Sequence, residues 1–168
     1  MRYAAPLFLL SSLIWGSSAM AAPVTMTKTA STKSDPLNNL LPRAIPGAII
    51  EYKVALAGAT TSSISLEFTD KVPANTSFCL SGFDLSGAPV VFIDTSFLLS
   101  SGLSFPFSSV TSPSDNLDFS KDNGVTWNYQ PTSDANGCDD LVTNIRVRFN
   151  GTFGAGKTAQ LQFRVRLR

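Results

Sequence analysis

The sequence predicts an all-β fold, an antiparallel sandwich of packed sheets formed by a single domain. Apolar and polar residues alternate in short segments along most of the chain, and no window shows the spacing of an amphipathic helix. Glycine, asparagine and proline separate these segments at close intervals, which is typical of strands joined by tight turns. Many short strands in this arrangement indicate a sandwich.

The clearest expected strand is Ala48–Ala57, whose apolar residues fall on one face with Glu51 and Lys53 opposite. In Ser63–Thr69, the same alternation places Ile64 inside. Residues 31–45 are the least regular part and are expected to link the first strand to the main sandwich. The other expected strands are Val24–Ala30, Thr76–Leu80, Pro89–Ile93, Leu103–Phe107, Leu117–Ser120, Val125–Tyr129, Thr143–Phe149 and Thr158–Leu167.

The N-terminus has the pattern of a secretory signal. Arg2 precedes an apolar run from Ala4 to Trp15, and small residues end at Ala19-Met20-Ala21. We therefore expect residues 1–21 to be a signal peptide, cleaved before Ala22, and residues 22–168 to form the sandwich domain. The apolar run is short for a membrane span, and no second one follows. The mature chain is expected without a membrane span, in the periplasm, at the cell surface or outside the cell.

Composition excludes several classes of function. Loss of Arg2 with the leader leaves 12 basic residues against 12 acidic ones, so the mature chain is neutral and poorly suited to nucleic acid. The sequence contains no histidine, which removes the usual general base, the usual metal ligand and the nucleophilic triads that depend on it. We expect a non-enzymatic protein without a cofactor.

Cys79 and Cys138 are the two cysteines of the chain. An isolated pair in an exported protein is expected to form a disulfide. Two free thiols, or a catalytic cysteine without histidine, are the alternatives.

Three segments together resemble the conserved-repeat domain of unknown function found in bacterial surface and secreted proteins. They are "TMTKTAS", "PGAIIEYKVALA" and "FTDKVPANTSF", within residues 24–80. The matching positions are Lys28, Pro46, Gly47, Ile50, Glu51, Tyr52, Val54, Thr69, Asp70, Pro73, Ala74, Asn75 and Thr76. The resemblance implies an immunoglobulin-like, Greek-key sandwich on the cell envelope and names no ligand.

The stretch "SKDNGVTW" matches the Asp-box, S-x-D-x-G-x-T-W, known from sialidases. Its defining residues are Ser120, Asp122, Gly124, Thr126 and Trp127. We interpret them as a structural turn in a hairpin that pairs Leu117–Ser120 with Val125–Tyr129, with Trp127 packed on the hairpin. A sialidase needs several such boxes on a propeller, which a chain of this length cannot build.

An acidic loop offers candidate calcium ligands in Asp134, Asn136, Asp139 and Asp140. The loop does not have EF-hand spacing, and solvated turn residues explain it equally well. No metal site is assigned, with calcium as the alternative.

A possible basic interaction face follows near the C-terminus. Alternation places Arg164, Arg166 and Arg168 on one side of the last strand, and Arg146 and Arg148 are expected beside them if "NGTFGAGK" is a hairpin loop. Such a stripe suits envelope polyanions. The alternative is a solvated strand face whose arginines pair with Glu51, Glu67 or the acidic loop.

The function expected from these features is a structural or interaction role at the bacterial envelope, with other envelope proteins or surface components as partners. The second hypothesis is a pilin-like subunit of a surface fibre, because "VTMTKTA" could serve as a donated strand.

Overall fold

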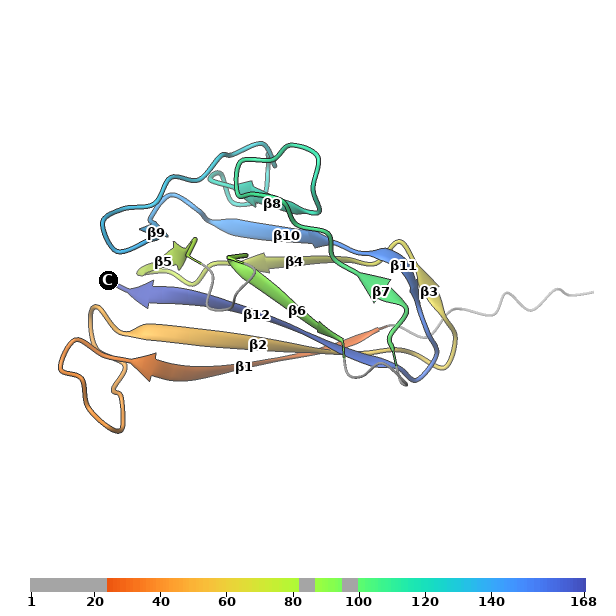
Figure 1. The fold of residues 1–168 in the computed structure, drawn as a ribbon, viewed down its shortest axis with the longest axis horizontal. Helices are drawn as coiled ribbons and strands as arrows, with labels where there is room; N and C mark the ends of the chain where they lie inside the picture. Colours follow the sequence, from red (N-terminus) through yellow and green to blue (C-terminus); the bar gives the residue numbers. More distant parts are fainter. Residues whose placement is uncertain (1–23, 82–86, 95–99) are drawn as a thin grey trace, which may run out of the picture.

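The computed structural model describes residues 24–81, 87–94 and 100–168 (Figure 1). The predicted fold class is confirmed, since the described chain is an all-β protein whose sheets are antiparallel and whose two main sheets pack face to face. Nowhere in these ranges is there a helix with the length and apolarity to cross a membrane. The expected signal peptide lies outside the described residues.

The larger sheet has the strand order β1-β2-β12-β5-β9, with β6 also paired to β12. Its strands are β1 (Thr25–Ser34), β2 (Ile49–Ala57), β5 (Thr76–Cys79), β6 (Val90–Asp94), β9 (Cys138–Asp139) and β12 (Thr158–Leu167). The smaller sheet has the order β4-β10-β8 and consists of β4 (Glu67–Lys71), β8 (Leu117–Ser120) and β10 (Asn144–Arg148). A third, short sheet at one end contains β3 (Ser63–Ile64), β7 (Leu103–Ser104) and β11 (Asn150–Phe153).

The core lies between the two main sheets because alternate residues of their strands point inward. In β12, the residues at every second position from Ala159 to Val165 are at most 2% exposed, and Ile145 and Val147 of β10 are fully buried opposite them. Phe78 of β5 joins the layers, since its ring centroid lies 5.8 Å from that of Phe119 and 6.0 Å from that of Phe163. Burial of each such ring contributes about 2–3 kcal/mol relative to exposure.

Three expected strands differ clearly in extent from those observed, and one of them, Leu103–Phe107, is reduced to β7, Leu103–Ser104. The first strand continues to Ser34, past its expected end at Ala30, because β2 offers a partner for it in nearly every position. The expected strand Ser63–Thr69 is interrupted at Ser65, whose φ of 57° turns the backbone. Ile64 is therefore 75% exposed in β3, and the prediction that it lies inside is wrong.

The second half of the chain has two strands that the alternation did not reveal, β9 and β11. β9 is only two residues long and pairs with β5. β11 begins at Asn150-Gly151, at the start of the segment "NGTFGAGK" that could have been a hairpin loop. Gly151 has φ of 97°, and a Cβ atom there would lie 2.2 Å from the carbonyl oxygen of Gly102. The glycine therefore serves the close approach of β11 to β7.

Candidate functional site

The Asp-box forms a closed network of hydrogen bonds at the end of β8. The Asp122 carboxylate accepts hydrogen bonds from the Ser120 hydroxyl at 2.7 Å, the Thr126 N–H at 2.9 Å and the Thr126 hydroxyl at 2.7 Å. The Ser120 oxygen in turn accepts the Gly124 N–H at 2.9 Å. These donors, led by the Thr126 N–H, lower the pKa of Asp122 to about 2. The carboxylate therefore stays ionised and holds the turn.

The expected hairpin partner of β8 does not form a strand. Val125–Tyr129 contributes one bridge, between Tyr129 and Phe119, and β8 pairs instead with β10. The Asp-box curls the chain too tightly for a second ladder strand to follow directly. Trp127 is consequently half-buried on the outer face of the smaller sheet rather than in the core.

Trp127 covers an ion pair on that outer face. The Arg146 guanidinium carbon lies 4.7 Å from the Trp127 ring centroid, within the range of a cation–π contact. Arg146 also bonds the Asp118 carboxylate through Nε and Nη2, each at 2.9 Å. Arg148 reaches the same carboxylate at 3.2 Å. Asp118 is thus fully engaged by two arginines.

A pocket of about 250 Å³ lies beside this cluster. Leu117 and Phe119 are among its apolar lining residues, Trp127 and Tyr129 supply aromatic rings, and Asn128 is one of its neutral polar groups. Asp118 also lines the pocket, and its oxygens are already bound to the two arginines. The pocket can contact a small neutral or amphipathic group, but this lining offers no uncommitted acid or base.

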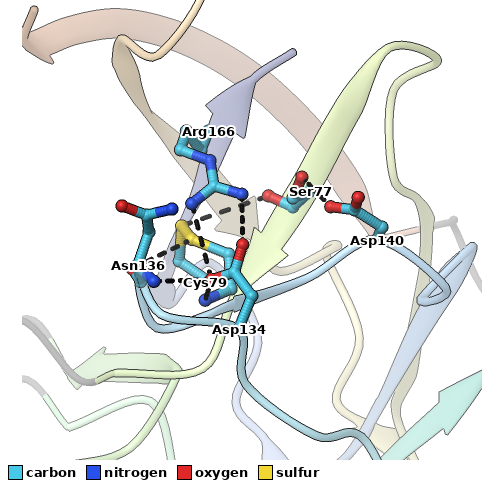
Figure 2. Close-up of a disulfide and its surroundings, with 7 residues drawn as sticks. Ser77, Cys79, Asp134, Asn136, Asp140 and Arg166 are labelled. Carbon is cyan, nitrogen blue, oxygen red and sulfur yellow. Dashed lines mark hydrogen bonds and ion pairs between the residues drawn. A yellow bond between two sulfur atoms is a disulfide. The ribbon is translucent and has the colours of Figure 1, made fainter. Parts of the chain in front are cut away.

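The predicted disulfide between Cys79 and Cys138 is formed (Figure 2). The two cysteines lie directly opposite each other in the β5–β9 pair, and both are buried. A backbone hydrogen bond connects the same two segments, since the Leu80 N–H donates to the Gly137 carbonyl at 2.8 Å. The bond therefore attaches the acidic loop to the edge of the larger sheet.

Asp134 organises this loop. Its carboxylate accepts the N–H groups of Asn136 at 2.8 Å and Cys138 at 3.0 Å. It also receives Arg166 from β12, with Nη2 at 2.5 Å from Oδ2 (Figure 2). Arg166 first, and the Cys138 N–H second, hold the pKa of Asp134 well below its usual range. The charge of Asp134 is therefore used within the fold.

The other acidic candidates point to different partners. Asp139 is 4% exposed and accepts the Tyr129 hydroxyl at 2.9 Å and the Thr132 N–H at 2.7 Å. Burial, and then Asp139, raise the pKa of Tyr129 to about 12. Asp140 bonds the Ser77 hydroxyl.

The calcium alternative for the loop therefore has no convergent set of carboxylates to support it. Within residues 24–81, 87–94 and 100–168, three or more His, Cys, Asp or Glu side chains nowhere gather into a group that could hold a metal ion. The loop carboxylates are separated because each one caps a different backbone segment or binds a different side chain.

The five arginines do not form one basic face, so that prediction is wrong. Arg146 and Arg148 belong to β10 of the smaller sheet, whereas β12 of the larger sheet carries Arg164 and Arg166 and ends next to Arg168. The segment "NGTFGAGK" is not a simple hairpin loop, because it contains β11 and carries the chain from one sheet to the other. All five pair with acids: Arg146 and Arg148 with Asp118, Arg164 with Glu51, Arg166 with Asp134, and Arg168 with Asp140. The alternative named the partners of Arg164, Arg166 and Arg168, and Arg146 also lies 4.0 Å from the expected Glu67.

Sequence reasoning named Glu51 as a possible arginine partner but missed its burial. Glu51 is 3% exposed, although it lies on the outer face of the larger sheet. Arg164 donates to its Oε2 at 3.1 and 2.9 Å, and Lys33 lies 3.3 Å from Oε1. Burial raises the pKa of Glu51, but the opposing bonds and charges of Arg164 and Lys33 lower it overall. No pattern in the sequence marks this burial, because the covering side chains come from distant strands.

A second feature missed from the sequence is the ordered loop after β1. The buried carboxylate of Asp35 accepts the N–H groups of Leu37 at 2.9 Å and Arg43 at 2.8 Å, together with two bonds from Asn39. These bonds, led by the Arg43 N–H, lower the pKa of Asp35 to about 2. The loop so fixed presents exposed leucines: Leu37 at 69%, Leu40 at 100% and Leu41 at 86%.

The polar groups described above thus support turns, loops and ion pairs, and the accessible features include an aromatic pocket and a leucine-bearing loop. No family model, curated protein or solved structure matches this chain.

Proposed function

We propose that this protein is exported and acts as a non-enzymatic β-sandwich with a structural or interaction role at the bacterial cell envelope. The observation that carries the proposal is the disulfide between Cys79 and Cys138. Disulfides form and persist in oxidising compartments and are rare in the reducing cytoplasm. The signal-like pattern of residues 1–21 supports the same location.

The use of the acidic groups supports a non-enzymatic role. Asp122, Asp134 and Asp139 each accept backbone N–H groups that shape a turn or loop. A general acid or base must exchange its proton near the working pH. The pKa values of Asp122 and Asp134 are instead held low, and the chain has no histidine to take this role.

The loop after β1 supports an interaction role. Its leucines are exposed although Asp35 fixes the backbone that carries them. Apolar side chains presented on an ordered loop favour contact with another surface. The resemblance of residues 24–80 to the conserved-repeat domain favours an immunoglobulin-like topology and an envelope location.

The pairing of β1 weighs against the fibre-subunit hypothesis. β1 pairs with β2 of its own chain from Thr25 to Ser34, and β12 already lies inside the larger sheet. A donated strand would instead leave its own sheet to complete a neighbour. We therefore favour the envelope module over the pilin-like subunit.

Fractionation of bacteria that express the full chain tests the proposal. We expect the protein outside the cytoplasm, with a mass that begins at Ala22 and lacks the two thiol hydrogens of Cys79 and Cys138. A matched Cys79→Ser/Cys138→Ser variant should show the same new N-terminus. A cytoplasmic protein that retains residues 1–21 and both free thiols would overturn the proposal.

A further inference from the structure

β1 is an edge strand, and within the described residues no strand pairs with its outer side. It ends the larger sheet. The seven consecutive residues from Thr25 to Ser31 are all exposed, which includes residues on both faces of the strand. Its register with β2 is regular from Thr25 to Thr32, and the irregularity comes only between Thr32 and Ser34. A long regular edge of this kind is a template for strand addition unless the protein protects it.

The usual protective devices are not available along Thr25–Thr32. This run contains no proline, and its bulge lies beyond it. β1 carries two lysines, but both are turned toward acids of the same chain. Lys28 pairs with Asp70, and Lys33 lies 3.3 Å from Glu51. Their charges are therefore directed away from the open edge.

Three other strands that end the two main sheets are protected. β4 carries Glu67 and Lys71 within five residues, and the Glu67 side chain is 48% exposed. In β8, the Phe119 carbonyl accepts a hydrogen bond from the Tyr129 N–H at 3.2 Å, so the chain that follows β8 covers this edge. β9 is two residues long, and its Cys138 carbonyl accepts the Asp134 N–H. β6, which also pairs with β12, is a further edge, and it is five residues long and ends at Asp94. Among these five described edges, β1 is the longest, with ten residues, and lacks such protection along Thr25–Thr32.

We propose that β1 is a self-association surface, on which the β1 strand of a second copy adds antiparallel to form a two-fold dimer with a continuous sheet. Such an interface is isologous, so each residue of one strand meets its symmetry partner in the other. The proposal goes beyond an envelope role and does not depend on it.

The strand sequence selects one register. Opposed residues in an antiparallel pair point to the same face, so the two-fold axis must pass through a residue position. An axis at Lys28 would oppose two lysines, which is unfavourable. An axis at Ala30 would leave the start of β1 unpaired. An axis at Thr29 pairs the whole run from Thr25 to Lys33.

The Thr29 register also places compatible side chains opposite each other. Thr29 meets Thr29 of the second copy, and Thr27 meets Ser31, which are favourable hydroxyl pairs in sheets. On the inner face, Lys28 meets Ala30 and Met26 meets Thr32. No like charges are opposed in this arrangement, and Met26, 44% exposed in the monomer, gains cover.

The leucine-bearing loop extends the same interface. It follows β1 directly, and antiparallel pairing brings the end of each β1 beside the start of the other. Leu37, Leu40 and Leu41 thereby add apolar area near the partner's first strand residues. A strand pair alone buries little surface, whereas stable dimers bury about 1,200–2,000 Å² in total. The ordered loop supplies the additional contact.

Oligomeric state and site-specific crosslinking test the proposal on protein purified after export. We expect light scattering to show a dimer in the micromolar range. Thr29→Lys opposes two new lysines at the axis and should yield a folded monomer with an unchanged circular-dichroism spectrum. Thr29→Val, which keeps a strand-forming residue, should remain dimeric. A wild-type monomer across this range, or a dimeric Thr29→Lys variant, would overturn the proposal.

A cysteine scan tests the register independently. In the proposed dimer the two Thr29 Cα atoms lie about 4.5–5.5 Å apart, which suits a disulfide. Thr29→Cys should therefore form a covalent dimer under mild oxidation. Thr27→Cys is the matched control, because its two copies are about 13 Å apart along the strands. Equal crosslinking of both variants would contradict the register and with it the symmetric pairing.

Discussion

Lys28 of β1 and Asp70 of β4 form an ion pair that connects the edge of the larger sheet to the smaller sheet. Lys28 starts from the inner face of β1, where it lies beside Val54 in the register, and crosses the gap to the opposite layer. Its Nζ also lies 4.3 Å from the Tyr52 ring centroid. This contact connects the two sheets at β1 and β4, which are both end strands.

Replacement of either member should cause a small loss of stability. The side chains of Lys28 and Asp70 are 32% and 17% exposed, so water screens their attraction. We expect Lys28→Met and Asp70→Asn to show a coupling of about 0.5–1 kcal/mol in a double-mutant cycle measured by urea unfolding. A coupling near zero would mean that the pair does not hold the sheets together.

The same carboxylate acts on Tyr52. Burial, and then the charge of Asp70, raise the pKa of Tyr52. Asp70→Asn removes the charge, so the tyrosine should ionise at a lower pH in an ultraviolet titration. Asp118→Asn, on the outer face of the smaller sheet, is the control that should leave this titration unchanged.

The disulfide should contribute most of the stability where the acidic loop attaches to β5 of the larger sheet. Its closure spans 59 residues of sequence separation, for which chain entropy predicts about 4 kcal/mol of stabilisation. We expect Cys79→Ala/Cys138→Ala to lose up to this amount in denaturant unfolding. A loss below about 1 kcal/mol would show that the β5–β9 contact holds without the bond.

Local alternation was sufficient to predict the fold class and the long strands β2 and β12. β12 matches its expected range, Thr158–Leu167, because its alternation runs uninterrupted for ten residues. The prediction failed where tertiary pairing decided the outcome. Val125–Tyr129 alternates like a strand, but the Asp-box directs it away from β8, and β10 takes its place. Alternation cannot show which strand a given strand will pair with.

Candidate sites were predictable only where the chemistry is local. Ser120, Asp122 and Thr126 bond within seven residues, so their roles could be read from the motif. The placement of the arginines on two different sheets could not be predicted from the sequence, since it depends on β11 carrying the chain from one sheet to the other. The burial of Glu51 also depends on strands far apart in the sequence, with Arg164 bonding it from 113 positions away.

Asp122 should make stability depend on pH. Its pKa in the fold is about 2, below its ordinary value of 3.8, so it stabilises the folded state above about pH 4 and loses this contribution as the pH falls toward 2. Asp122→Ala should lower the melting temperature by a few degrees at pH 7. The difference from wild type should shrink between pH 4 and pH 2. A difference that stays constant over this range would exclude the ionised carboxylate as its source.

Glu51 should be the most sensitive charged position of the larger sheet. Its side chain is 4% exposed and meets Arg164 and Lys33. Removal of its charge leaves these partners uncompensated, although their own partial exposure moderates the effect. We expect Glu51→Gln to reduce the free energy of unfolding by about 2 kcal/mol.

Two variants distinguish this loss from a general effect of removing a surface charge. Glu67→Gln changes a 48% exposed side chain that lies 4.0 Å from Arg146, and it should have almost no effect. Glu51→Leu combined with Arg164→Met replaces the buried pair by apolar groups and should recover much of the lost stability, because no charge then remains buried without its partner. If the double variant is no more stable than Glu51→Gln, the pair contributes through specific geometry rather than through compensation of buried charge.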